Sequence, residues 1–111
     1  MVVAVSEKNF SQEVLEAKAP VIVTFWAPWC GLCRRVEPLI SQLQSAATPP
    51  LKVVRINADE NLRLTREYRL TTLPTVLLFE QGKLVKRLEG MDGYVEARTA
   101  INQMLEQHPL G

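Results

Sequence analysis

Only two cysteines occur in the chain, Cys30 and Cys33, and two residues separate them. The run Val21–Trp26 before them is apolar and rich in β-branched residues, which predicts a buried strand. Residues 34–47 after them have apolar side chains at helical spacing. A Cys-x-x-Cys pair at a strand-to-helix junction lies at the positive end of the helix, which favours the thiolate that attacks disulfides. The pattern therefore predicts exchange between a dithiol and a disulfide.

Length and charge narrow the classes of protein to which the chain can belong. Its 111 residues suit one hydrophobic core, so we expect a single domain over residues 1–111. The formal net charge is +1, which gives no reason to expect binding to nucleic acid or to a membrane. The apolar stretches are too short to span a bilayer, and the first residues lack the basic region of a secretory signal. We expect a monomer in the cytoplasm, or in an organelle stroma if a transit peptide has been removed.

The cysteine count also limits structural roles for sulfur. Two cysteines cannot build a framework of several disulfides. A closed zinc site normally has about four ligands, whereas the chain offers Cys30, Cys33, His108 and carboxylates, and His108 lies in an expected C-terminal tail. We therefore expect no metal site and no organic cofactor. In a reducing compartment the cysteine pair would cycle between dithiol and disulfide.

Patterning along the chain predicts alternating strands and helices. Strands are expected at residues 2–5, 21–26, 51–57, 75–79 and 83–89, with a hairpin turn at Gln81-Gly82 between the last two. Helices are expected before the second strand, after the cysteines, over residues 61–68 and at the C-terminal end. This order predicts an α/β fold with a central mixed β-sheet flanked by helices on both faces.

Local signals predict where the helices begin and end. Ser6 and Asp92 have side chains suited to N-caps of the first and last helices. The first helix is expected to carry Phe10, Val14 and Leu15 on one face. Pro38 is expected to kink the helix after the cysteines, and Thr48-Pro49-Pro50 is expected to end it.

With these elements in place, the chain resembles the thioredoxin family. Residues 25–33, with the sequence FWAPWCGLC, resemble the family's active-site segment, and Leu73-Pro74-Thr75 resembles the segment that carries its cis-proline. Further matches are the helix-kinking Pro38, the acid Asp59 near the first active-site tryptophan, and the glycines Gly82 and Gly90. The resemblance runs over about residues 2–105 and implies the thioredoxin fold.

Three positions depart from the family's pattern. Thr24 stands where thioredoxins usually carry a buried aspartate, Leu32 stands where proline is usual, and Arg55 stands where lysine is common. Threonine cannot act as a base at neutral pH, so we expect the second cysteine to lose its proton slowly. Leu32 restores a backbone N–H near Cys30, and an added donor to the thiolate would make the couple more oxidising.

The resemblance implies roles for the residues of the site. Cys30 is the expected nucleophile that forms a mixed disulfide with the target, and Cys33 is expected to attack Cys30 and release the reduced target. Trp26 is expected to be a core residue. The expected substrate-binding residues are Trp29, Gly31, Leu32, Leu73, Pro74 and Gly90. The expected partners are target proteins that contain disulfides and a thioredoxin reductase that supplies electrons.

Two other interpretations stay open at this point. The chain could be a more oxidising exchanger or redox sensor, or a partner-binding module in which the dithiol contributes little. Arg63, Arg66 and Arg69 are compatible with a basic docking face, but Glu60 and Glu67 lie among them, which favours a solvated face of mixed charge.

Overall fold

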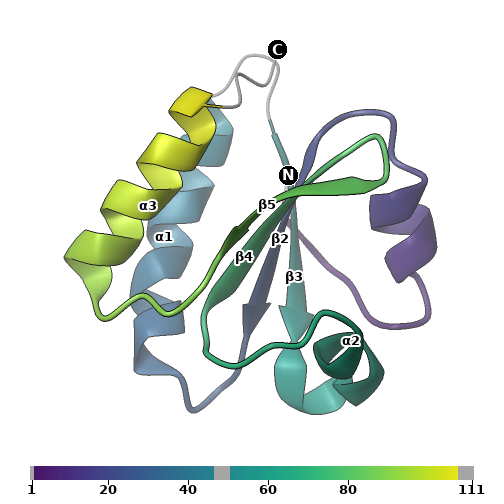
Figure 1. Ribbon diagram of the computed structural model, residues 1–111, viewed down its shortest axis with the longest axis horizontal. Helices are drawn as coiled ribbons and strands as arrows, with labels where there is room; N and C mark the ends of the chain where they lie inside the picture. The colour runs from purple at the N-terminus through teal and green to yellow at the C-terminus, as the bar shows by residue number, and fades with distance from the viewer. Residues whose placement is uncertain (1, 47–50, 108–111) are drawn as a thin grey trace.

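The computed structural model describes residues 2–46 and 51–107. The strands are β1 (Val2–Ala4), β2 (Val21–Trp26), β3 (Lys52–Asn57), β4 (Thr75–Glu80) and β5 (Lys83–Leu88). The α-helices are α1 (Gly31–Ala46), α2 (Leu62–Glu67) and α3 (Tyr94–Gln107), and the shorter helical segments are η1 (Ser11–Leu15) and η2 (Ala58–Glu60). This succession follows the expected alternation of strands and helices (Figure 1).

The strands form one five-stranded mixed sheet in the order β1-β3-β2-β4-β5. β1 and β2 both run parallel to β3, whereas β4 is antiparallel to β2 and β5 is antiparallel to β4. Parallel neighbours need a crossover connection, and α1 supplies the one from β2 to β3. The N-terminus of α1 therefore lies at the edge of the sheet where β2 and β3 end (Figure 1).

Helices cover both faces of the sheet, which is the predicted layering (Figure 1). Because side chains alternate along a strand, each strand contributes to two separate cores. The core under α1 and α3 contains Ile22, Val53, Val76 and Leu78 from the sheet. The core under η1 and α2 contains Val21, Val23, Phe25, Val54, Ile56, Leu77 and Phe79 from the sheet.

The first helical segment differs from the helix expected after Ser6. It is a π-helix of five residues, η1, and Ser6 lies in a turn before it, where the Ser6 carbonyl accepts a hydrogen bond of 3.2 Å from the Asn9 amide. Phe10 and Val14 are buried as expected. Leu15, which was expected on the same face, is 37% exposed. Leu15 is the last residue of the segment, and its backbone faces the β4–β5 turn.

Two other predicted boundaries change. β1 ends at Ala4, before the expected Val5, although Val5 is buried in the core. α3 begins at Tyr94, directly after Gly93, so the predicted N-cap at Asp92 is wrong. The Asp92 amide instead donates a hydrogen bond of 3.0 Å to the Glu96 carboxylate. The predicted helix end at residues 48–50 and the tail residue His108 lie outside the described residues.

The turn between β4 and β5 is the predicted Gln81-Gly82 turn. Both residues have positive φ angles, 51° and 80°, as in the type I′ turns that suit hairpins. A Cβ atom on Gly82 would lie 2.5 Å from the carbonyl oxygen of Leu15. Glycine is therefore required here by both conformation and space.

Candidate active site

The two cysteines lie where β2 passes into α1. β2 ends at Trp26, and the turn that follows is closed by a hydrogen bond of 3.0 Å from the Cys30 amide to the Ala27 carbonyl. α1 begins at Gly31, directly after Cys30. Cys30 and Cys33 form a disulfide with 5.3 Å between their Cα atoms. The cysteine pair predicted from the sequence is thus a disulfide at the N-terminus of a helix.

A backbone amide of α1 points at the first cysteine. The Cys33 N–H donates a hydrogen bond of 3.1 Å to Sγ of Cys30. Amides in the first turn of a helix have no earlier carbonyl as a partner, so this donor is free to serve a sulfur atom. It would stabilise a thiolate on Cys30 once the disulfide is reduced. The sequence predicts an added donor at Leu32, whereas the hydrogen bond in the structure comes from the amide of Cys33.

Both cysteines are nearly buried, with 5% of Cys30 and 6% of Cys33 exposed. They form a small apolar cluster with Ala27, and the side chains packed against it are Trp26, Leu32 and Leu73. An apolar setting disfavours the ionised form of a thiol. Leu73 belongs to the loop before β4, so the cluster joins the dithiol to a segment that is distant in sequence.

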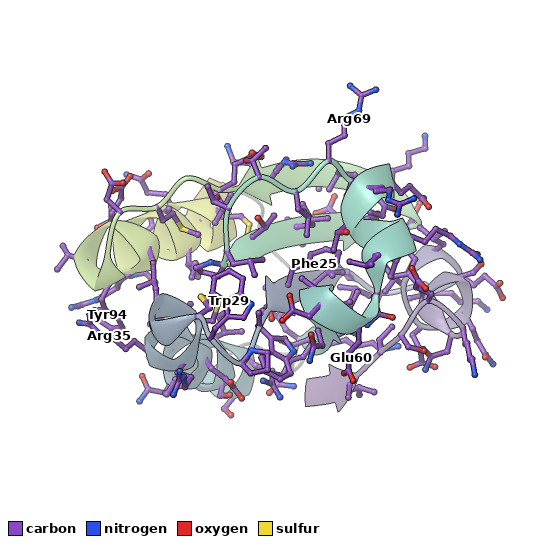
Figure 2. The ribbon with its side chains drawn as sticks, turned by 90° about the horizontal axis from the view of Figure 1, so that it is seen from below. Phe25, Trp29, Arg35, Glu60, Arg69 and Tyr94 are labelled. Carbon is purple, nitrogen blue, oxygen red and sulfur yellow. A yellow bond between two sulfur atoms is a disulfide. The ribbon has the colours of Figure 1, made fainter. Side chains whose placement is uncertain are left out.

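Trp29 is the exposed residue next to the dithiol. Its side chain is 67% exposed, and its indole Nε1 donates a hydrogen bond of 3.0 Å to Oδ2 of Asp59 in η2. Figure 2 looks onto this edge of the sheet and shows Trp29 near the centre of the surface. Trp26, which was expected in the core, is only partly buried. The guanidinium of Arg55 lies 4.5 Å above the centre of its ring.

The predicted cis-proline lies in the loop that carries Leu73. The Leu73–Pro74 peptide bond is cis, and Pro74 is buried. Gly90 has a φ of 67°, and its amide donates a hydrogen bond of 2.9 Å to Oγ1 of Thr72. The structure therefore connects the loop of Gly90 to the loop of Pro74. Thr72 was not identified from the sequence, because only the tertiary structure brings these loops together.

A hollow of about 250 Å³ opens beside Trp29. Leu73 and Asp59 line it together with Leu62 and Leu70. Leu62 is 56% exposed, so α2 turns one of its leucines away from the core. Leu62 and Leu70 were not identified from the sequence, where the weak helical pattern of α2 was the only available signal. Of the expected substrate-binding residues, Gly31 is exposed at the start of α1 and Leu32 is half-buried against the disulfide.

The position of the missing aspartate is buried. Thr24 is 8% exposed on β2, with Arg55 of β3 and Val76 of β4 as its neighbours across the sheet. Arg55 also forms an ion pair, in which its Nη2 lies 3.1 Å from Oε2 of Glu37 on α1. Position 24 therefore holds a neutral hydroxyl with an ion pair beside it.

Basic side chains flank the start of α1. Nη2 of Arg34 donates a hydrogen bond of 2.9 Å to the Pro28 carbonyl, and the guanidinium of Arg35 lies 5.4 Å from the centre of the Tyr94 ring. Figure 2 shows Arg35 and Tyr94 on one side of the site and Arg69 pointing outward on another. The arginines are thus spread over the surface around the dithiol.

Within residues 2–46 and 51–107, no group of three or more histidine, cysteine or acidic residues is placed to hold a metal ion. No helix in these ranges is long and apolar enough to cross a membrane.

One shifted pKa belongs to the core on the other face of the sheet from α1. Tyr68 packs against Phe10 and Phe79, with 5.7 Å and 5.9 Å between the ring centres. Burial raises the pKa of the Tyr68 phenol, and the negative charge of Glu67 raises it further. This shift concerns the stability of the fold, not the chemistry of the dithiol.

The fold and the site define a class of protein. A disulfide-forming Cys-x-x-Cys pair at a helix N-terminus, with a cis-proline loop packed against it, is the site of a thiol–disulfide oxidoreductase. The family model for thioredoxin matches residues 1–106, and the chain belongs to the thioredoxin family. Members of this family reduce protein disulfides by dithiol–disulfide exchange, and this is the activity of the chain.

Curated relatives agree with the family over most of the chain. Thioredoxin 1 of Nostoc sp. is 38% identical over 104 residues, which are 94% of this chain and 94% of that protein. The M-type chloroplastic thioredoxin of Chlamydomonas reinhardtii is 38% identical over 87 residues, 78% of this chain and 62% of that protein. The bifunctional thioredoxin reductase/thioredoxin of Mycobacterium leprae is 36% identical over 91 residues, 82% of this chain and 20% of that protein.

Proposed function

We propose that residues 1–111 act as one thioredoxin-like domain in which Cys30 attacks the disulfide of a target protein and Cys33 releases the product. The nearly equal burial of the two cysteines does not distinguish their roles. The hydrogen bond from the Cys33 amide to Sγ of Cys30 supports the assignment best, because a donor aimed at one sulfur favours the thiolate there.

The reaction then has two exchange steps. The thiolate of Cys30 attacks one sulfur of the target disulfide, a mixed disulfide forms, and the other target sulfur leaves as a thiolate. Cys33 loses its proton and attacks Sγ of Cys30, so the Cys30–Cys33 bond forms and the second target sulfur leaves. The second step is effectively intramolecular, because the Cα atoms of the two cysteines are only 5.3 Å apart in one chain.

The proposed substrate surface surrounds the disulfide. It consists of Trp29, Gly31, Leu32, Leu73, Pro74 and Gly90. The exposed indole of Trp29 and the hollow beside it supply apolar contact area. The backbone of Leu73 can pair with an extended target segment, as edge strands do.

Electrons for the oxidised chain would come from a separate thioredoxin reductase. The Mycobacterium leprae relative, whose name describes a reductase and a thioredoxin in one protein, supports this kind of donor. We place the protein in the cytoplasm or in an organelle stroma, in line with the chloroplastic name of the Chlamydomonas relative.

Single cysteine variants test the assignment of roles. In an assay in which dithiothreitol supplies the electrons and the chain reduces insulin, Cys30→Ser should abolish the reduction, because the attacking thiolate is absent. Cys33→Ser should accumulate mixed disulfides with target proteins, because release needs the second thiol. The assignment is reversed if Cys33→Ser turns over normally while Cys30→Ser accumulates the mixed disulfides.

A further inference from the structure

With the cysteine roles of the proposed function, Cys33 must lose its proton before it can release the target. This residue is 6% exposed in an apolar cluster, where an ionised thiol is disfavoured. The hydroxyl of Thr24 on the sheet below α1 cannot accept a proton at neutral pH. A different acceptor near Cys33 would therefore speed the release step.

Glu37 lies on the same face of α1 as Cys33. Residues four apart in a helix are neighbours, with about 5–6 Å between their Cβ atoms. The face that they share is turned toward the sheet, because Val36 and Ile40 beside them are buried. Oε2 of Glu37 lies 3.1 Å from Nη2 of Arg55 on β3. The carboxylate is therefore on the side of the helix that faces the sheet.

Arg55 holds this carboxylate in place. Its guanidinium lies 4.5 Å above the centre of the Trp26 ring, and only 26% of its side chain is exposed. Arg55 is also the neighbour of Thr24 across the sheet. A guanidinium that contacts both an indole ring and a carboxylate has little freedom to move, so the Glu37 carboxylate has a defined position.

A small cavity lies between α1 and the sheet at this point. Its volume is about 10 Å³, and its lining residues are Thr24, Glu37, Ile40, Ser41, Val53 and Arg55. Cys33, one helical turn before Glu37, does not line it, so a water molecule here contacts the acceptor side of the proton path. This volume is at the lower limit for one water molecule, which also needs two to four polar partners. The hydroxyls, the carboxylate and the guanidinium of the lining residues are suitable partners.

We propose that Glu37 accepts the Cys33 proton through water during release, with Arg55 positioning its carboxylate. In the mixed disulfide, the Cys33 thiol gives its proton to the water as the water gives a proton to Glu37. The Cys33 thiolate attacks Sγ of Cys30, the intramolecular disulfide forms, and the target sulfur leaves with the electron pair as a thiolate. Glu37, whose side chain is 45% exposed, then returns the proton to solvent.

Titratable groups on the other elements around α1 have different partners. The carboxylate of Asp59 accepts the hydrogen bond from the exposed Trp29 indole. Tyr94 on α3 contacts Arg35. β3 contributes the Arg55 guanidinium, which is a cation. Among these groups, Glu37 combines a carboxylate with a place on the helix face of the second cysteine.

The variant Glu37→Gln tests the proposal, because it keeps the size of the side chain and removes its charge. Stopped-flow kinetics with a peptide disulfide whose reduced form is fluorescent, from about pH 6 to pH 9, would measure mixed-disulfide formation and release separately. Formation should be unchanged. Release at pH 7 should be about tenfold slower, below the usual effect of about 10²–10⁴-fold for general acid–base catalysis because solvent competes. The release rate of the variant should also rise more steeply with pH than that of the unaltered chain.

Two further variants separate proton transfer from a structural effect. Glu37→Asp keeps the carboxylate and should restore part of the release rate. Glu106→Gln removes an exposed carboxylate at the C-terminal end of α3 and should change neither the formation rate nor the release rate. Equal release rates and pH profiles in Glu37→Gln and the unaltered chain would overturn the proposal, as would equal slowing in Glu37→Gln and Glu37→Asp. If the unaltered chain formed no mixed disulfide on Cys30, the proposed cysteine roles would fail instead.

Discussion

An aspartate at position 24 should replace the function that we assign to Glu37. Thr24 is buried beside Arg55, on the strand below the helix that carries both Cys33 and Glu37. Adding Thr24→Asp to Glu37→Gln therefore puts a carboxylate back near the buried thiol from the opposite side of the cavity. We expect the double variant to release its target faster at pH 7 than Glu37→Gln alone.

The ionisation of an ordinary thiol sets the size of this gain. An ordinary thiol with a pKa of about 8.5 is about 3% thiolate at pH 7, so complete ionisation of such a thiol would speed release by about 30-fold. A buried thiol is less ionised than this, so the gain can be larger. The gain should shrink as the pH approaches 9, because the thiol then ionises without help. In a chain that keeps Glu37, Thr24→Asp should give a smaller gain, because an acceptor is already present.

Stability should change in the opposite direction. Position 24 is 8% exposed, and burying a polar group without full hydrogen bonding costs about 1–3 kcal/mol. With a urea dependence of about 1–3 kcal/mol per M, the unfolding midpoint should fall by about 1 M. The loss should be smaller in the double variant, because Arg55 no longer pairs with Glu37 and can pair with the new carboxylate.

Both quantities can be measured on the same preparations. Stopped-flow release of a disulfide substrate between about pH 6 and pH 9 gives the kinetic effect, and urea unfolding gives the stability. If Thr24→Asp lowers the stability but does not speed release in Glu37→Gln at any pH, proton removal from Cys33 does not limit this protein. Glu37 would then not be the proton acceptor that controls release.

Three further predictions concern other parts of the molecule. Leu32→Pro removes a backbone N–H from the first turn of α1. It should lower the reduction potential of the Cys30–Cys33 couple by some tens of millivolts, where about 30 mV equals about 1.4 kcal/mol. An unchanged or higher potential, measured against a glutathione buffer, contradicts this prediction. Gly82→Ala should lower the free energy of unfolding by about 1–3 kcal/mol in urea titrations, because φ is 80° and the new Cβ would lie 2.5 Å from the Leu15 carbonyl oxygen; Gly93→Ala, where a Cβ would have open space, is the control. Because the pKa of Tyr68 is raised in the folded chain, its phenol ionises at a lower pH in the unfolded chain. Stability present below about pH 10 is therefore lost as the pH rises through the folded-state pKa. Tyr68→Phe should weaken this alkaline loss of stability, and an equal loss in both proteins would exclude Tyr68 as its source.

Several elements could be predicted because their signals are local. Neighbouring residues predict the β-branched strand β2, the hairpin turn at Gln81-Gly82 and the position of the cysteines at the start of α1. The first helix was predicted less well. Its apolar spacing suits an ordinary amphipathic helix, but the segment is a short π-helix that packs against the β4–β5 turn.

The sequence by itself determined the order of elements, the position of the dithiol and the family, because these follow from local pattern and motif. The tertiary structure alone decided which distant groups surround the dithiol. Only the packing of α1 on the sheet pairs Glu37 with Arg55 beside Thr24, and only the loop arrangement joins Thr72 to Gly90. Such contacts depend on strand order and register, and no local pattern along the chain encodes them.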